Sequence, residues 1–152
     1  MTGILFVCYG NICRSPMAEF VMKDLTAKVG RQAEFVIESA ATDPCNTGSG
    51  VYPPARRKLS QHGIDCAGKR ARPMERADYG RFDLLIGMDD ENIREMRRIC
   101  GGDPDGKIRL LLDFTERPGK EADPWYTGDF EATWRDVSEG CRGLLDWLDA
   151  AE

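Results

Sequence analysis

The sequence predicts an α/β fold: a single three-layer domain over residues 1–152, in which a four-stranded parallel sheet carries helices on both faces. Short apolar runs alternate with helical patterns along the chain, which is typical of βαβ units. The apolar runs are nearly continuous, as in strands that are buried on both faces of a sheet. A length of 152 residues, with 41% hydrophobic and 31% charged residues, suits one globular domain.

The first βα unit is the clearest. "GILFVC" (3–8) has the apolar, β-branched and aromatic residues of a buried strand. Apolar residues at helical spacing over 15–30 predict a helix, with Ser15 as its N-cap and Gly30 at its end. "EFVIESA" (34–40) is expected to form the second strand.

The remaining elements follow in the same alternation. We expect helices over 53–63, 90–102 and 130–150, and strands over 82–88 and 107–114. The core face of the last helix is expected to consist of Trp134, Leu144, Leu145, Trp147 and Leu148. The basic runs 56–58 and 69–72 are interpreted mainly as solvated surface.

Composition excludes several classes of protein. No apolar stretch approaches the roughly 20 residues of a membrane helix, and the N-terminus has no export signal, so we expect a cytoplasmic protein with reduced thiols. The six cysteines form no CxxC pair and His62 is the only histidine, which argues against a disulfide framework and a zinc site. The net charge of −5 argues against nucleic acid as the main partner.

The segment "CYGNICRS" (8–15) lies between the first strand and the first helix, where backbone N–H groups and the helix dipole favour an anion. Gly10 and Asn11 tolerate the sharp turn that directs these N–H groups inward. Arg14 can make a two-pronged contact with a tetrahedral oxyanion. Cys8 is then favoured as a thiolate nucleophile for covalent phosphoryl transfer, and Ser15 is placed to hydrogen-bond its sulfur. An inert cysteine at the end of a core strand would need none of these neighbours.

A second candidate segment, "DPWY" (123–126), follows the fourth expected strand. Parallel strands end at one edge of the sheet, so this segment and the cysteine loop are expected to meet there. Asp123 is the candidate acid that protonates the leaving oxygen. Trp125 and Tyr126 can wall a slot for an aromatic group, although two aromatics that fold back onto the core would also suit a simple turn.

The chain resembles the low-molecular-weight protein tyrosine phosphatases. The similarity rests on the C-x5-R-S loop at 8–15, "SAAT" (39–42), "MDDEN" (88–92) and "DPWY" (123–126), and it spans essentially the whole chain. The resemblance implies hydrolysis of phosphotyrosine in proteins, and of small aryl phosphates, through a cysteinyl-phosphate intermediate. It also implies that no metal or cofactor is required.

The resemblance also implies roles for individual residues. Cys8 is expected to be the nucleophile, Arg14 the phosphate clamp, and Asp123 the general acid and then the base. The rest of the implied site comprises the loop residues Tyr9, Gly10, Asn11, Ile12, Cys13 and Ser15, the pocket residues Trp125 and Tyr126, and Ser39 as a partner of Asn11. Cys13 is the neighbouring thiol that can form a reversible disulfide with Cys8.

The implied partners are phosphotyrosine-containing proteins as substrates, and inorganic phosphate or other oxyanions as inhibitors. Neither a nucleic acid nor a membrane partner is expected. The oligomeric state expected is a monomer, with a weak dimer as the alternative. Two positions depart from the family pattern: Lys69 stands where many relatives carry a histidine, and Tyr9 where small or aliphatic residues are common.

Three other functions are compatible with parts of the pattern. A thiol-dependent arsenate reductase needs two further cysteines after the third strand, where the chain offers only Cys100. A protein arginine phosphatase typically has threonine where this chain has Ile12, and an apolar residue there favours an aromatic ring. An inactive phosphate-binding module would be expected to lack Cys8, Arg14 or Asp123, and all three are present.

Overall fold

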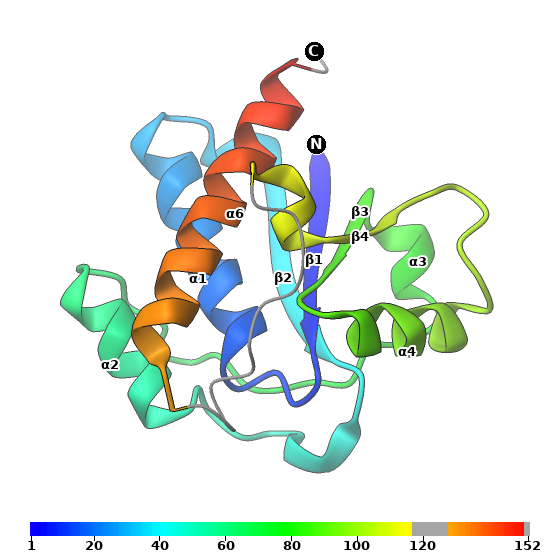
Figure 1. Ribbon diagram of the computed structural model, residues 1–152, viewed down its shortest axis with the longest axis horizontal. Coiled ribbons are helices and arrows are strands. Elements are labelled where there is room, and N and C mark those ends of the chain that lie inside the picture. The colour runs from blue at the N-terminus through cyan, green and yellow to red at the C-terminus, as the bar shows by residue number, and fades with distance from the viewer. Residues whose placement is uncertain (117–127, 151–152) are drawn as a thin grey trace.

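The computed structural model describes residues 1–116 and 128–150. Four parallel strands form one sheet in the order β2-β1-β3-β4, which confirms the predicted fold class (Figure 1). The strands are β1 (Thr2–Cys8), β2 (Phe35–Ala41), β3 (Leu84–Gly87) and β4 (Ile108–Leu110). Because all four run in the same direction, their carboxyl ends lie along one edge of the sheet.

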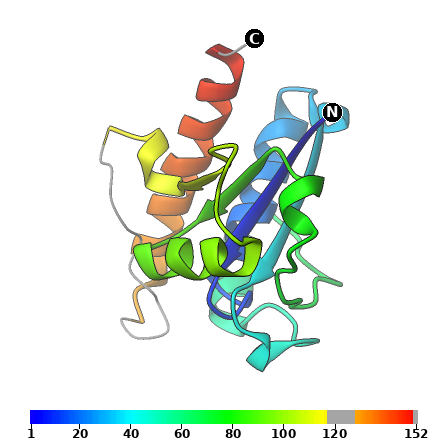
Figure 2. The same ribbon diagram turned by 90° about the vertical axis from the view of Figure 1, so that its right-hand side faces the viewer.

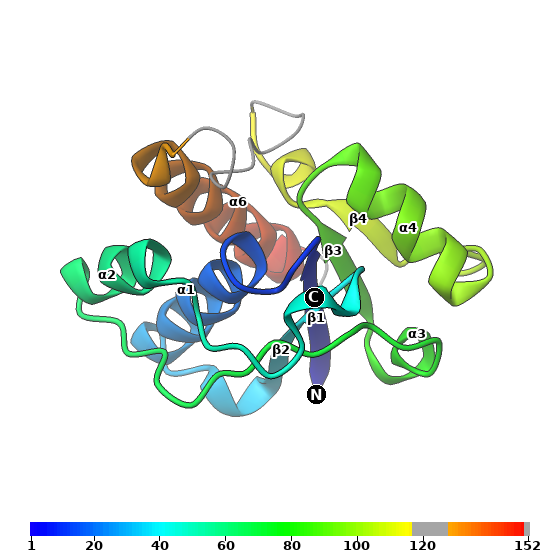
Figure 3. The same cartoon turned by 90° about the horizontal axis from the view of Figure 1, so that it is seen from below.

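Helices cover both faces of the sheet. They are α1 (Arg14–Lys28), α2 (Pro53–Gln61), α3 (Asp78–Arg81), α4 (Asp90–Cys100) and α6 (Phe130–Ala150), with 3-10 turns at η1 (Gln32–Glu34), η2 (Pro44–Asn46) and η3 (Leu111–Phe114). Figure 2 shows α3 and α4 in front of the sheet, and Figure 3 shows α1, α2 and α6 on the opposite side. No helix in the described part of the chain is long and apolar enough to cross a membrane.

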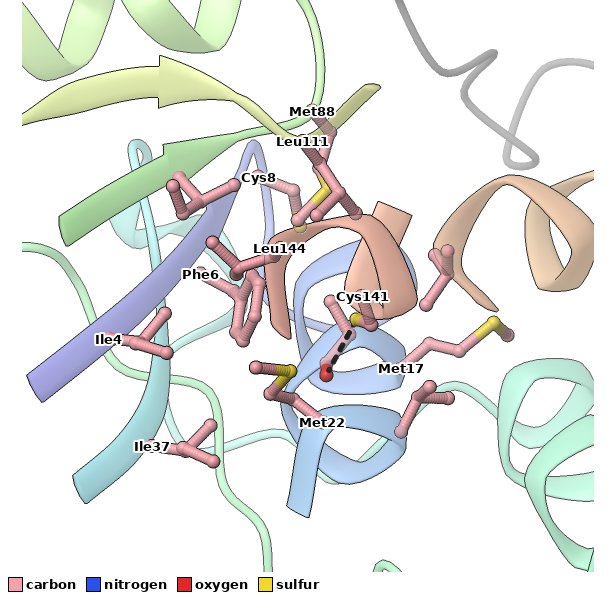
Figure 4. Packing of buried hydrophobic residues seen from close by; sticks show 14 of the residues in the cluster. Ile4, Phe6, Cys8, Met17, Met22, Ile37, Met88, Leu111, Cys141 and Leu144 are labelled. Carbon is pink, nitrogen blue, oxygen red and sulfur yellow. Dashed lines mark hydrogen bonds between the residues drawn. The ribbon is translucent and has the colours of Figure 1, made fainter. Parts of the chain in front are cut away.

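Strand β1 is buried on both faces, and its alternating side chains enter two hydrophobic clusters. Ile4, Phe6 and Cys8 pack toward α1 and α6, in the cluster that Figure 4 shows. Leu5 and Val7 belong to the second cluster, toward α4. This two-sided burial is the physical reason why the strand reads as a continuous apolar run.

The fourth strand is shorter than predicted. Only Ile108–Leu110 pairs with β3, and the chain then turns into η3. Two glycines of α6 allow η3 to pack directly on that helix: a Cβ at Gly140 would lie 2.4 Å from Leu111 Cγ, and one at Gly143 1.9 Å from the Phe114 carbonyl oxygen. The run over 107–114 is therefore apolar for two reasons: its first part is a strand, and its second part, η3, is buried against α6.

Two further predictions were wrong. Ser15 is not the N-cap of α1, because the helix begins at Arg14 after Cys13, and Ser15 is directed at other partners. Trp147 is 39% exposed rather than part of the core, although Leu144 and Leu145 are buried. The Trp147 ring makes an edge contact with Phe114 instead.

Candidate active site

The segment 9–13 joins β1 to α1 at the carboxyl edge of the sheet. Asn11 adopts a positive φ of 56°, which an Asn tolerates better than most residues. Gly10 passes close to η2, since a Cβ there would lie 2.5 Å from Asn46 Nδ2. The loop is therefore tightly curled and pressed against the segment that follows β2.

Cys8 is the last residue of β1 and directly precedes this turn. Cys8 is 3% exposed, and its Sγ is 2.9 Å from the Oγ of Ser15, a fully buried residue in the first turn of α1. Side chains here also experience the positive end of the α1 dipole. The turn therefore holds a buried sulfur beside a hydroxyl and at the N-terminal end of a helix.

Asn11 ties the loop to three other segments. Its Nδ2 donates to Ser15 Oγ at 2.8 Å and to Ser39 Oγ at 2.9 Å, and its Oδ1 accepts from the backbone N–H of Arg72 at 3.2 Å. Asn11 is 1% exposed, so these bonds are shielded from water. The strained backbone of the loop is therefore supported by a satisfied polar side chain.

Ser39 contacts a buried ion pair, Glu19 and Lys69, that the sequence pattern does not predict as part of the site. Ser39 Oγ donates to Glu19 Oε1 at 2.5 Å, and Lys69 Nζ donates to the Ser39 carbonyl oxygen at 2.9 Å and lies 3.5 Å from Glu19 Oε1. The Lys69 side chain is only 11% exposed, so the interpretation of 69–72 as solvated surface is wrong at this position. The signal available in the sequence is Glu19, a charged residue on the buried face of the helix predicted over 15–30, which needs a partner.

Arg14 is buried, with 2% exposure, and its Nη1 donates to Asp89 Oδ2 at 2.8 Å. Asp89 is the N-cap of α4, and its other oxygen, Oδ1, accepts from the backbone N–H of Asn92 at 2.8 Å. One carboxylate thus joins the guanidinium to the helix after β3. Asp89 belongs to the block 88–92 that carries the family resemblance, but the sequence alone does not predict its contact with Arg14.

The rim of the loop is partly open to solvent. Tyr9 is 50% exposed, and the negative charge of Asp43 raises the pKa of its hydroxyl. Hydrogen bonding to the backbone N–H of Cys45 lowers the pKa of Asp43, which favours the carboxylate. Ile12 is half-buried, and its carbonyl oxygen accepts from the N–H of Tyr52 at 2.9 Å.

The structure therefore brings Cys8, Asn11, Arg14, Ser15 and Ser39 together at one edge of the sheet. Cys13, also named from the sequence, is buried in the same loop. The predicted residues Asp123, Trp125 and Tyr126 lie outside the described residues. The described part alone offers a buried sulfur, a fixed guanidinium and a helix N-terminus, a combination that suits a tetrahedral oxyanion.

Comparison with known proteins agrees with this geometry. A sequence profile described as "Low molecular weight phosphotyrosine protein phosphatase" matches residues 3–152. The chain is 38% identical over 147 residues to the low molecular weight protein-tyrosine-phosphatase YfkJ of Bacillus subtilis (strain 168), a match that covers 95% of this chain and 94% of that protein.

Solved structures are also similar. The crystal structure of YfkJ from Bacillus subtilis matches with a TM-score of 0.97 and 36% identity, covering 100% of this chain and 97% of that one. A Drosophila arginine phosphatase matches with a TM-score of 0.87 and 29% identity, covering 97% and 98% of the two chains. By its sequence and by its fold, the chain belongs to the low molecular weight protein-tyrosine phosphatase family.

Proposed function

We propose that this protein hydrolyses phosphotyrosine in proteins through a cysteinyl-phosphate intermediate, and that the whole chain acts as one phosphatase domain. The observation that carries the proposal is the contact of 2.9 Å between the Cys8 sulfur, at the end of β1, and Ser15 Oγ, in the first turn of α1. A phosphate bound in that loop would have the nucleophile beneath it and the Arg14 guanidinium beside it.

In the first half-reaction, the Cys8 thiolate attacks phosphorus and the bond between phosphorus and the phenolic oxygen breaks. Asp123 gives its carboxyl proton to that oxygen, so the tyrosine leaves as a neutral phenol. The charge that develops on the phosphoryl oxygens is stabilised by Arg14 and by backbone N–H groups of the loop. Phosphorus is then bonded to the Cys8 sulfur.

In the second half-reaction, a water attacks phosphorus and gives a proton to the Asp123 carboxylate. The bond between phosphorus and sulfur breaks, and inorganic phosphate leaves. Cys8 departs as a thiolate, and the Ser15 hydroxyl is close enough to stabilise the negative charge by donating a hydrogen bond. Because phosphate is the product, we expect it and similar oxyanions to inhibit.

Hydrolysis of phosphoarginine is the second candidate, and similarity to the Drosophila arginine phosphatase favours it. Ile12 argues for the first candidate, because an apolar side chain at the rim suits an aromatic ring better than a charged guanidino group. The two candidates share the nucleophile and the clamp, so they differ in substrate rather than in mechanism.

The deciding experiment measures phosphate release at mildly acidic pH from three peptides of one sequence that carry phosphotyrosine, phosphoserine or phosphoarginine. Wild type is compared with Cys8→Ser, which lacks the nucleophile, and with Cys100→Ser, which removes a buried thiol of α4. We expect turnover of phosphotyrosine alone, lost in Cys8→Ser and kept in Cys100→Ser. Preferential turnover of phosphoarginine would support the second candidate, and no turnover of any peptide would refute both.

Asp123→Asn tests the proposed acid. The variant is expected to lose far more activity on a peptide phosphotyrosine than on an aryl phosphate whose phenol is acidic enough to leave unprotonated. Equal losses on the two substrates would contradict a proton-donor role.

We further propose that the protein works as a monomer in the cytoplasm on phosphotyrosine-containing proteins. Cys45, Cys66 and Cys100 are free thiols, as is usual in a reducing compartment. Fractionation of the source cells would test the location, and light scattering the oligomeric state. Recovery in an oxidising compartment, or a stable dimer at micromolar concentration, would contradict these statements.

A further inference from the structure

A continuous chain of buried hydrogen bonds leads from an ion pair to the nucleophile. It runs from Lys69 and Glu19 through Ser39 and Asn11 to Ser15, whose Oγ lies 2.9 Å from the Cys8 sulfur. The link between Ser15 and Cys8 can in principle run in either direction, because both groups can donate and accept. Its direction follows from the rest of the chain.

The amide of Asn11 has two possible orientations, and only one fits its neighbours. The backbone N–H of Arg72 can only donate, so the amide oxygen of Asn11 must face it. The two protons of Asn11 Nδ2 then point at the hydroxyl oxygens of Ser15 and Ser39. Since the Ser15 oxygen already accepts from Asn11, its own proton is available for the Cys8 sulfur.

Glu19 strengthens this choice from the other end. A carboxylate only accepts, so the Ser39 proton is directed at Glu19 Oε1, 2.5 Å away, and the Ser39 oxygen is left to accept from Asn11. Without an acceptor at position 19, the Ser39 proton would turn toward Asn11. The Arg72 N–H still holds the Asn11 oxygen, so Asn11 Nδ2 and the Ser39 proton would face each other as two donors. Asn11 would then shift away, and the Ser15 hydroxyl would lose the donor that directs its own proton at the sulfur.

We propose that Glu19, with Lys69 as its buried counter-ion, is a positioning residue that sets the direction of these hydrogen bonds, so that Ser15 donates to the Cys8 sulfur. The proposal deepens the proposed function, because it rests on Cys8 acting as the thiolate nucleophile. Glu19 is 4% exposed, and a buried carboxylate needs a nearby cation. Lys69 supplies that cation from inside, where it also bonds the Ser39 carbonyl.

Glu19 has two lysine neighbours, and Lys69 is the more buried of the two. Burial lowers the pKa of Lys69, while the negative charge of Glu19 opposes this effect and the nearby cations Arg72 and Lys23 add to it. Lys23 lies 2.6 Å from the other Glu19 oxygen, Oε2, but its side chain is 45% exposed. The Cys66 thiol also lies within the field of Glu19, and burial raises its pKa.

The test follows the thiolate directly rather than turnover. Alkylation of Cys8 by iodoacetamide is measured against pH in phosphate-free buffer, and the peptide that contains Cys8 is quantified by mass spectrometry. This readout needs no substrate, so it remains informative if the proposed function fails. The variants are Glu19→Met, the double variant Glu19→Met with Lys69→Met, and Lys23→Met as the matched control.

In Glu19→Met, the proposal and simple charge effects predict opposite results. Removing a negative charge by itself would stabilise the thiolate and lower the pH midpoint of alkylation. If Glu19 directs the Ser15 proton, losing it raises the midpoint by about one pH unit, a tenfold smaller thiolate fraction below the midpoint. A midpoint that falls or stays in place overturns the proposal.

The double variant guards against a failure to fold. It replaces a buried ion pair by apolar side chains of similar length, a change that proteins often tolerate, and it leaves the net charge unchanged. The same rise of about one pH unit is expected there, whereas Lys23→Met keeps the acceptor and should leave the midpoint unmoved. Equal midpoints in wild type and the double variant, or an equal rise in Lys23→Met, would overturn the proposal even if thermal stability changes.

Discussion

Asp89 performs two tasks with two different oxygens, which makes them separable by mutation. Its Oδ2 accepts from Arg14 Nη1 at 2.8 Å, and its Oδ1 accepts from the backbone N–H of Asn92 at 2.8 Å as the N-cap of α4. In Asp89→Asn the amide oxygen can keep the cap. The amide nitrogen then faces the guanidinium, so two donors meet where an ion pair stood.

The structure sets the size of the expected effect. Arg14 is 2% exposed and the Asp89 side chain 23%, so solvent screens the pair little. A hydrogen bond to a charged group contributes about 1.5–3 kcal/mol net, and an N-cap about 1 kcal/mol. We expect Asp89→Asn to lower the free energy of unfolding by about 2 kcal/mol and Asp89→Ala by about 3 kcal/mol.

Catalysis should respond to the lost ion pair and not to the lost cap. A guanidinium that is no longer held in one orientation should reduce kcat about tenfold, which corresponds to about 1.4 kcal/mol of transition-state stabilisation. Asp89→Ser is the matched control, because serine is a good N-cap but is too short to hold Arg14 in the same way. It should resemble Asp89→Asn in kcat and exceed Asp89→Ala in stability.

The assay combines urea denaturation of the four proteins with steady-state hydrolysis of an aryl phosphate at saturating substrate. A kcat for Asp89→Asn within twofold of wild type would refute the idea that this ion pair orients Arg14. Equal stability of the serine and alanine variants would refute the capping role.

Two further predictions concern stability. Gly143→Ala should lower the free energy of unfolding by about 3 kcal/mol, because its Cβ would lie 1.9 Å from the Phe114 carbonyl oxygen. Gly80→Ala is the control: the space around its Cβ is open, so this variant should be neutral or more stable by about 0.5 kcal/mol. Similar midpoints of thermal unfolding in the two variants would contradict the prediction. Burial alone would raise the pKa of Asp103, but hydrogen bonds from the Tyr79 hydroxyl and from two backbone N–H groups outweigh it and lower the pKa. Because the pKa is lowered in the folded state, ionised Asp103 contributes fully to the free energy of unfolding above about pH 4, and this contribution is lost as pH falls. Asp103→Asn should therefore be less stable than wild type by about 2 kcal/mol at pH 7, and by less below pH 4. An equal difference at pH 7 and at about pH 2.5 would refute the assignment.

Much of the fold is readable from local pattern. The predicted helix over 130–150 coincides with α6, and the prediction of a strand over 3–8 differs from β1 by one residue. Period and burial are properties of neighbouring residues, so a local pattern carries them. The end of β4 was misjudged because η3 is apolar for a different reason, its close approach to Gly140 and Gly143.

The loop that carries Cys8 and Arg14 could also be predicted from neighbouring residues, because the end of the strand, the turn and the start of the helix follow one another within 8–15. The positive φ of Asn11 agrees with the residue type found there. Short spacing made this part of the site predictable, because each residue's task depends mainly on its immediate neighbours.

By itself, the sequence determined the order along the chain of the four strands and the four longer helices, and the position of the anion-binding turn, because periodicity and turn chemistry act over a few residues. The short helix α3 was not predicted. Only the tertiary structure decided what holds that turn in shape. Arg14 and Asp89 are 75 residues apart, and Lys69 is 30 residues from Ser39. Such partners meet because parallel strands end at one edge of the sheet, where residues far apart in the sequence lie close together. The packed helices bury charged side chains at this edge. A buried charge needs an ion pair or a hydrogen bond, and only the tertiary structure decides which side chain provides it.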